Sequence, residues 1–206
     1  MWNKDIKKNL SLLGIDTKKQ LDKNDIVFWW QKKFLEIQKN NEVDLLPEVP
    51  EVETVSRGLK LKIIGKKISK YQQFREDLRW PIPPSMKELI EGSIIKSICR
   101  RGKFLLINLD VDYTIIIHLG MTGTFRIQKL GSNETKKHDH VVFEFSKEIL
   151  IFNDPRRFGS LHISKDPQDH FLIKHLGPEP LEDDFNSEYL CKKIKKAEVS
   201  TKSFLM

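Results

Sequence analysis

Cysteine is scarce in this sequence: Cys99 and Cys191 are the two among 206 residues, and they form no C-x-x-C pair. Structural zinc sites and disulfide frameworks use several cysteines at short spacings, so we expect neither here. Long apolar runs are also lacking, since none has the length of a bilayer span and the N-terminus has no signal-peptide core. We therefore expect a cytoplasmic chain with no membrane partner.

Acidic residues are fewer than basic ones, 29 against 36, which gives a formal net charge of +7. A basic chain suits a polyanionic partner such as nucleic acid, although charge alone does not identify the partner. Hydrophobic residues make up 39% of the chain and charged residues 32%, a composition typical of a globular protein. The length suits one domain with an appendage.

Residues 1–46 are the expected appendage. Apolar residues at helical spacing, among them Ile6, Leu10, Phe28 and Trp29, predict two amphipathic helices. Lysines are interleaved with acids there, which favours a solvated helical face over a binding surface. A polar linker at residues 40–44 then leads into the rest of the chain.

The segment Pro47–Thr54 contains two prolines and three glutamates in eight residues. One interpretation is a helix start, with Pro50 in the first turn and acids facing the positive end of the helix dipole. The other is a chemical site, which depends on the residues that surround it. In either case we expect a helix to about Leu59, with Val52 and Val55 on its buried face.

The hydrophobic period changes from helix to strand after this helix, and strand-like sequence begins at residues 62–68. A short helix is expected over residues 86–90, and two more over 168–175 and 187–196. Seven further short strands are expected at 94–99, 104–109, 113–117, 124–127, 141–145, 149–152 and 161–163. Turns every 8–12 residues are the rhythm of a sandwich or barrel. We therefore expect an α+β protein in which helices flank a β-sandwich.

Three polar loops between these strands each have a structural and a functional interpretation. Residues 100–103 are either a charged edge that resists strand addition or a phosphate clamp with a lysine near a reaction centre. Residues 118–123 are either a glycine turn with Met121 in the core or a loop that pushes an apolar wedge between bases. Residues 153–159 are either a salt-bridged turn or a loop whose arginines contact phosphates and whose Phe158 stacks.

A fourth polar segment, residues 137–140, alternates in a way that predicts His138 and His140 on one side of a strand. A metal site there needs further ligands of the right kind, and the sequence offers none. We expect no metal in this chain.

Six segments occur in the order and rough spacing of a known family. They are Pro47–Val55, Arg101–Phe104, His118–Gly123, Lys137–His140, Asp154–Gly159 and His175–Leu181. Residues 47–206 thus resemble bacterial formamidopyrimidine-DNA glycosylase, and resemble the endonuclease VIII branch of that superfamily less. The resemblance implies a β-sandwich domain that excises oxidised purines such as 8-oxoguanine and formamidopyrimidines in base excision repair. It also implies lyase cleavage of the abasic strand, with double-stranded DNA as partner and a monomeric protein.

The resemblance also implies roles for individual residues. Pro47 matches the nucleophile, Glu48 the acid that opens the sugar ring, Glu51 a supporting carboxylate and Lys103 the catalytic lysine. The expected DNA-binding residues are His118, Met121, His138, Arg156, Arg157 and Phe158. Among these, Met121, Arg156 and Phe158 match the side chains that fill the gap left by an everted nucleotide.

The chemistry of a free N-terminal proline explains its use as a nucleophile. It is a secondary amine, and α-amino groups have pKa values of about 7.7–8.0, so a useful neutral fraction exists at physiological pH. Attack on the sugar C1′ expels the base and leaves an iminium that has no N–H to lose. The iminium therefore stays cationic and withdraws electrons while the 3′ and then the 5′ phosphate leave.

The sequence departs from the family pattern in three places. Pro47 is internal, and its nitrogen is an amide bonded to Leu46, so we hypothesise that translation begins at Leu46 and that removal of the initiator frees Pro47. The chain ends at Met206, before the family's helix-two-turn-helix domain and its four-cysteine zinc finger, so we expect a truncated form without the zinc. The family's lysine contact in the final segment falls near Glu198 and is not carried over.

We therefore expect three regions: a helical extension at 1–46, the glycosylase β-sandwich at 47–182, and the start of the helical DNA-binding domain at 183–206. We also expect nucleoid association in the cytoplasm. Two functions stay open: a bifunctional glycosylase and lyase, or a catalytically inactive remnant that binds DNA.

Overall fold

The computed structural model describes residues 48–132 and 136–194. The expected helical extension at 1–46 and the nucleophile Pro47 lie outside these ranges. The described residues belong to two compact units, one that ends at Gly177 and one that holds residues 178–194, and each is described by itself. The domain boundary expected at 182 stays a prediction.

Helix α3 (Val49–Ile63) opens the described part of the chain. Pro50 lies in its first turn, and its buried face is Val52, Ser56, Leu59 and Ile63. The helix is longer than expected because Ile63 completes the buried stripe one turn beyond Leu59. The predicted strand at 62–68 is therefore wrong, and Lys67 makes only an isolated bridge to Ile94.

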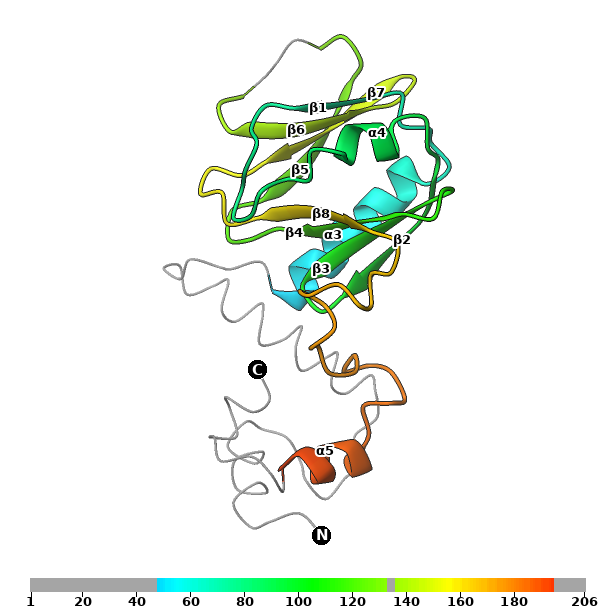
Figure 1. The fold of residues 1–206 in the computed structure, drawn as a ribbon, viewed down its shortest axis with the longest axis vertical. Helices are drawn as coiled ribbons and strands as arrows, with labels where there is room; N and C mark the ends of the chain where they lie inside the picture. Colours follow the sequence, from blue (N-terminus) through cyan, green and yellow to red (C-terminus); the bar gives the residue numbers. More distant parts are fainter. Residues whose placement is uncertain (1–47, 133–135, 195–206) are drawn as a thin grey trace. The chain divides into compact units, whose positions relative to one another are not determined.

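Two four-stranded antiparallel sheets form the body of the first unit (Figure 1). The first sheet has the order β1-β6-β7-β5, with bounds Lys70–Gln73, Asp139–Glu144, Glu148–Asn153 and Thr124–Lys129. The second has the order β2-β3-β4-β8, with bounds Ile95–Arg101, Phe104–Leu109, Thr114–His118 and Ser160–Ser164. The expected α+β class is confirmed, and each of the seven strands expected between residues 94 and 163 is found.

A single large apolar cluster joins the two sheets to α3 and α4 (Met86–Ile90). Ile107 and Ile115 enter this cluster from the second sheet, and Leu150 and Phe152 enter it from the first. Helix α3 packs against β2 and β3, which brings the start of the helix to the β2–β3 hairpin. This packing positions the site described below.

Strand β1 is an addition to the expected set. Its sequence is polar, and Tyr71 is its one fully buried residue, so it carries no apolar alternation from which a strand could be predicted. The strand exists because all four of its residues pair with β6. Tertiary pairing, rather than local sequence, decides its conformation.

Residues 168–175 fold as successive turns, so the predicted helix there is wrong. Asp166 accepts a hydrogen bond from the N–H of Gln168 at 2.9 Å, which starts a turn instead. Ile173 is the single fully buried side chain of this stretch, and it packs on Leu106 and Ile116 in a second, smaller apolar cluster. One buried position cannot make the apolar stripe that a helix needs.

In the second unit, helix α5 covers Ser187–Ile194. The Asn186 side chain accepts from the N–H of Tyr189 at 2.9 Å, so the expected cap is confirmed. Among the helices that the structure describes, none is both long and apolar enough to cross a bilayer.

Candidate nucleic-acid interface

The start of α3 and the β2–β3 hairpin meet in an acid–base pair. Lys103 Nζ lies 2.6 Å from Glu48 Oε2, and both side chains are about two-fifths exposed, at 41% and 44%. The Glu51 carboxylate accepts a hydrogen bond from the Glu48 N–H at 2.9 Å and so fixes the residue that precedes the helix. The pair therefore stands at the surface, directly after the peptide bond to Pro47.

Arginines hold this hairpin in place. Arg100 Nε lies 3.1 Å from Glu53 Oε2 on α3, and its guanidinium also donates to the Gly102 carbonyl at 3.0 Å. Burial raises the pKa of Glu53, but hydrogen bonds from Arg57 and Arg100 outweigh that effect and leave the pKa below its usual value. Arg101 donates to the carbonyl of Leu176 at 3.0 Å. Both arginines thus hold the hairpin that carries Lys103.

Strand register places His118 beside this hairpin. Arg101 pairs with Phe104, Phe104 with His118 and His118 with Ser160 in one row across the second sheet. The His118 and Phe104 ring centroids are 4.9 Å apart, and His118 Nδ1 accepts from the Gly120 N–H at 2.9 Å. Burial lowers the pKa of His118, and the charges of Arg79 and Lys103 lower it further. The imidazole is therefore neutral near pH 7, with its proton on Nε2 as a donor.

Asp154 links three loops that lie far apart in the sequence. Its fully buried carboxylate accepts from the Thr122 hydroxyl at 2.5 Å and from the Gly159 N–H at 2.8 Å. Its own N–H donates to the His138 carbonyl at 3.1 Å, and its carbonyl accepts from His140 Nε2 at 2.8 Å. The loops that carry Met121, His138 and Arg156 are thereby brought to one place.

Two glycines allow the first and third of these loops to touch. A Cβ on Gly120, which has a φ of +66°, would lie 2.3 Å from the Phe158 carbonyl carbon. A Cβ on Gly159 would lie 2.9 Å from the His118 carbonyl oxygen. No side chain fits at either position, so the residue type is fixed by backbone packing.

The third loop presents its polar and aromatic side chains to solvent. The Arg156 guanidinium lies 5.0 Å from the centre of the Phe158 ring, and Phe158 is 42% exposed. Arg157 is exposed and has a φ of +58°, an uncommon conformation for a residue with a side chain. Met121 is half-buried on the neighbouring loop.

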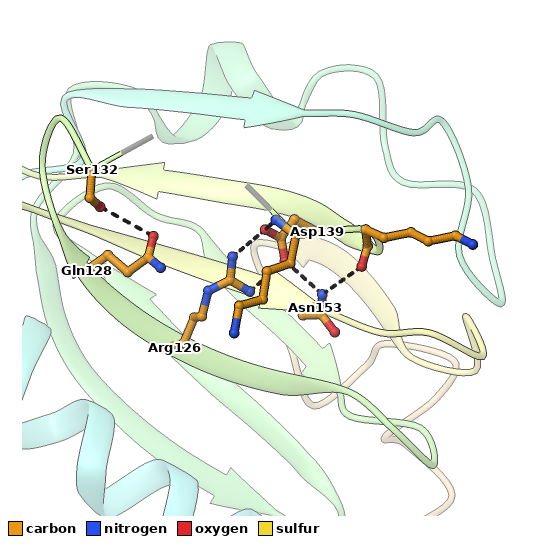
Figure 2. A network of polar contacts seen from close by, with 7 residues as sticks. Arg126, Gln128, Ser132, Asp139 and Asn153 are labelled. Carbon is orange, nitrogen blue, oxygen red and sulfur yellow. Dashed lines mark hydrogen bonds and ion pairs between the residues drawn. The ribbon is translucent and has the colours of Figure 1, made fainter. Parts of the chain in front are cut away.

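An ion-pair network supports the loop of His138 (Figure 2). The Arg126 guanidinium contacts both carboxylate oxygens of Asp139, at 2.6 Å on one side, and Asn153 donates to the same carboxylate at 2.7 Å. Burial raises the pKa of Asp139, but hydrogen bonds from Arg126, the Lys136 N–H and Asn153 bring it below its usual value. The network anchors the start of β6 while His138, with a φ of +82°, turns out of the strand.

Comparison with known proteins identifies this arrangement. The family model for the formamidopyrimidine-DNA glycosylase N-terminal domain matches residues 46–161. The chain belongs to this family. A formamidopyrimidine-DNA glycosylase of Legionella pneumophila (strain Lens) is 46% identical over 163 residues, which are 78% of this chain and 59% of the relative. One of Xanthomonas axonopodis pv. citri is 43% identical over 162 residues, with the same coverage.

Solved structures of formamidopyrimidine-DNA glycosylase agree with the fold. The Lactococcus lactis protein bound non-covalently to DNA with an abasic site matches with a TM-score of 0.70 and 34% identity, over 77% of this chain and 61% of that one. The same protein with DNA that contains FAPY-dG also matches with a TM-score of 0.70 and 34% identity, over 77% of this chain and 60% of that one. The chain spans about three-fifths of the length of these relatives.

The residues expected from the formamidopyrimidine-DNA glycosylase pattern fall into two groups. Glu48, Glu51 and Lys103 are in contact around the start of α3. The DNA-binding set is gathered on the loops that Asp154 joins, at the ends of β4, β6 and β8. Pro47 is bonded to Glu48 but lies outside the described residues.

Some residues of structural importance lie inside the expected motifs without an expected role. Thr122 and Asp154 are the main examples, because their hydrogen bonds join loops and leave no mark in the local sequence. Arg79 lies outside those motifs and also had no expected role: its N–H donates to the Gly159 carbonyl at 3.0 Å, and its positive charge lowers the pKa of His118. Local spacing contains no signal for any of these contacts.

A metal site between His138 and His140 finds no support. The two ring centroids are 6.4 Å apart, but His140 is buried and its Nε2 is hydrogen-bonded to the Asp154 carbonyl. Within residues 48–132 and 136–194, no group of three His, Cys, Asp or Glu side chains could hold a metal ion.

Proposed function

We propose that this chain provides the catalytic half of a base-excision-repair DNA glycosylase. Its substrate is duplex DNA with an oxidised purine, 8-oxoguanine or a formamidopyrimidine, and it also cleaves the abasic strand as a lyase. The observation that carries the proposal is the contact of 2.6 Å between Glu48 and Lys103, directly after Pro47, in a member of this family. The solved relatives bound to abasic-site and FAPY-dG DNA support the substrate class.

The chemistry begins at the nitrogen of Pro47 when that nitrogen is a free secondary amine. The nitrogen attacks C1′ of the damaged nucleotide and the base leaves, taking a proton from water. The Glu48 carboxylate takes up the proton that the nitrogen loses and then donates it to the ring oxygen as the sugar opens. Lys103 holds the Glu48 carboxylate at the reaction centre, and Glu51 fixes the Glu48 backbone. The cationic iminium then draws electrons as the 3′ and 5′ phosphates are eliminated in turn.

The loops hold the DNA in this proposal. His118, neutral and with Nε2–H as donor, joins His138 and Arg157 in contacting the backbone. Met121, Arg156 and Phe158 occupy the space of the everted nucleotide, where the exposed ring stacks on a neighbouring base. Binding should weaken steeply as salt rises, because phosphate contacts release counterions.

Borohydride trapping tests the proposal. Two proteins are compared, the 206-residue chain and a chain whose first residue is Pro47, each with duplex DNA that contains 8-oxoguanine or an abasic site. The chain that begins at Pro47 is expected to form a covalent adduct with both substrates. A Pro47→Ala variant of that chain, whose N-terminus is a primary amine, is the control. If this variant formed as much adduct as the parent, and the adduct were attached to a lysine side chain, the mechanism would be contradicted.

A second function is favoured by the sequence as it stands. In the 206-residue chain, Pro47 follows Leu46, so its nitrogen is an amide with no nucleophilic lone pair. This chain would then bind DNA without turnover. Salt-sensitive binding with no adduct from either protein supports this alternative, whereas an adduct from the shorter chain supports the glycosylase. We also propose that the protein acts as a monomer on the cytoplasmic nucleoid.

A further inference from the structure

We propose that the Thr122 hydroxyl is a positioning group that locks the loop of Met121 to the loop of Arg156 and Phe158. The three side chains then enter a duplex as one unit. The proposal concerns the loops themselves, and its consequence for DNA rests on the function proposed above.

The direction of each hydrogen bond at Thr122 is fixed by chemistry. The Thr122 hydroxyl donates to Asp154 Oδ1 across 2.5 Å. The lone pairs of the same hydroxyl are then available to the Arg156 N–H, which lies 3.1 Å away. One hydroxyl therefore bridges the buried carboxylate and the backbone of the insertion loop.

Asp154 is a firm anchor for this bridge. Its side chain is fully buried, and its second oxygen accepts from the Gly159 N–H at 2.8 Å. Its backbone is held at both ends by the residues of the His138 loop. Asp154 therefore holds the Thr122 hydroxyl from a position that is itself fixed.

The backbones of the two loops also approach each other closely at two glycines. Gly120 approaches the Phe158 carbonyl, and Gly159 approaches the His118 carbonyl oxygen, closely enough that a Cβ at either glycine would lie within 3 Å of the other loop. Such a contact fixes the separation of the backbones, whereas the Thr122 bridge fixes the register at which Met121 faces Arg156. Without the bridge, the two loops would have to be ordered during insertion, which slows it.

Amide exchange in the 206-residue chain tests the bridge without DNA. In Thr122→Val, which keeps the shape and loses the hydroxyl, the Arg156 and Gly159 amides should exchange about tenfold faster by NMR. Thr122→Ser keeps the hydroxyl and should match the parent. Thr124→Val is the matched control, because Thr124 is exposed and makes no side-chain hydrogen bond that the structure records. Unchanged exchange in Thr122→Val, or equal acceleration in Thr122→Ser, would overturn the proposal.

The rate at which the protein opens a duplex tests whether Met121, Arg156 and Phe158 enter DNA as one unit. A duplex with a tetrahydrofuran abasic analogue and an adjacent 2-aminopurine reports unstacking by fluorescence in a stopped-flow instrument. Thr122→Val should open it about tenfold more slowly, and Thr122→Ser at the parent rate. Parent-like opening by Thr122→Val would contradict the coupled insertion. If the parent itself opens no duplex while the exchange result holds, the proposed function fails and the coupling of the loops stands.

Discussion

Lys103 Nζ and Glu48 Oε2 are 2.6 Å apart, which joins a β-hairpin to the residue that begins helix α3. Both groups are substantially exposed, and an exposed ion pair contributes only about 0–1 kcal/mol to stability. Because this ion pair contributes so little to the free energy of unfolding, a catalytic role explains its presence better than a structural one. The first prediction follows from this difference between stability and activity.

Lys103→Gln should abolish most catalysis while leaving the fold intact. We expect the rate of borohydride trapping by the chain that begins at Pro47 to fall by about 10²-fold or more, as is typical when an acid–base partner is lost. The free energy of unfolding should change by less than about 1 kcal/mol. Lys96→Gln is the control, because Lys96 is an exposed lysine of the same hairpin on β2. An equal loss in both variants would refute a specific role for Lys103.

Arg157→Ala should reduce the salt dependence of DNA binding, because the proposed function assigns Arg157 a contact with the DNA backbone. One lost phosphate contact lowers the slope of log K against log[salt] by about 0.9, so affinity falls most at low salt. Fluorescence anisotropy with an undamaged duplex between 50 and 200 mM salt, about the range over which such effects are large, measures the slope. Lys62→Ala, on the last turn of α3 and about 20 Å along the helix axis from Glu48, should leave the slope unchanged. A slope that stays at the parent value in Arg157→Ala contradicts this role.

Gly120→Ala should destabilise the protein more than Gly131→Ala. Both glycines have positive φ, of +66° and +86°, so alanine costs about 1 kcal/mol of backbone strain at each. At Gly131 nothing lies within 4 Å of the added Cβ, whereas at Gly120 the Phe158 carbonyl carbon lies 2.3 Å away. We expect a further loss of about 1–3 kcal/mol at Gly120 in urea unfolding. Equal losses would mean that the two loops do not touch.

Stability should fall in mild acid because of His162. Burial and then the charge of His170 lower the pKa of His162 to about 4, against 6.5 for the free side chain. The unfolded chain therefore binds the extra proton first, and the free energy of unfolding falls by about 2–3 kcal/mol as pH drops from 6.5 to 4. Unfolding by urea at several pH values measures this, and His162→Leu should flatten the profile in that window. A parent profile that is already flat there would contradict the assignment.

The sandwich could be predicted from sequence because its strands carry their own signal. β3 and β4 are nearly continuous apolar runs, and the turns between them contain polar residues or glycine. β1 could not be predicted because its residues are polar and its pairing with β6 is a tertiary event. The helix expected at 168–175 is not formed. The local sequence predicted it, but the stretch has only one buried residue, Ile173, and so lacks the buried stripe that would hold a helix against the sheet.

The residues of the candidate site likewise divide into those that the sequence could predict and those that it could not. Glu48, Lys103 and the arginines of the Arg156 loop were predictable because the family pattern keeps them in short motifs. The roles of Thr122 and Asp154 were not, because each depends on loops that come together only in the folded chain. The sequence suggested a phosphate clamp at Arg100 and Arg101, which stays a prediction, while their hydrogen bonds to Glu53 and Leu176 hold the hairpin in place, a role that the sequence did not suggest.

The most direct test is the site of covalent attachment. After borohydride reduction of the chain that begins at Pro47 on abasic-site DNA, tandem mass spectrometry of the adduct locates the deoxyribose remnant. The account predicts attachment at the Pro47 nitrogen and a sharp loss of adduct in Glu48→Gln. A remnant on the Lys103 side chain, or an adduct that forms equally well without Glu48, would contradict it.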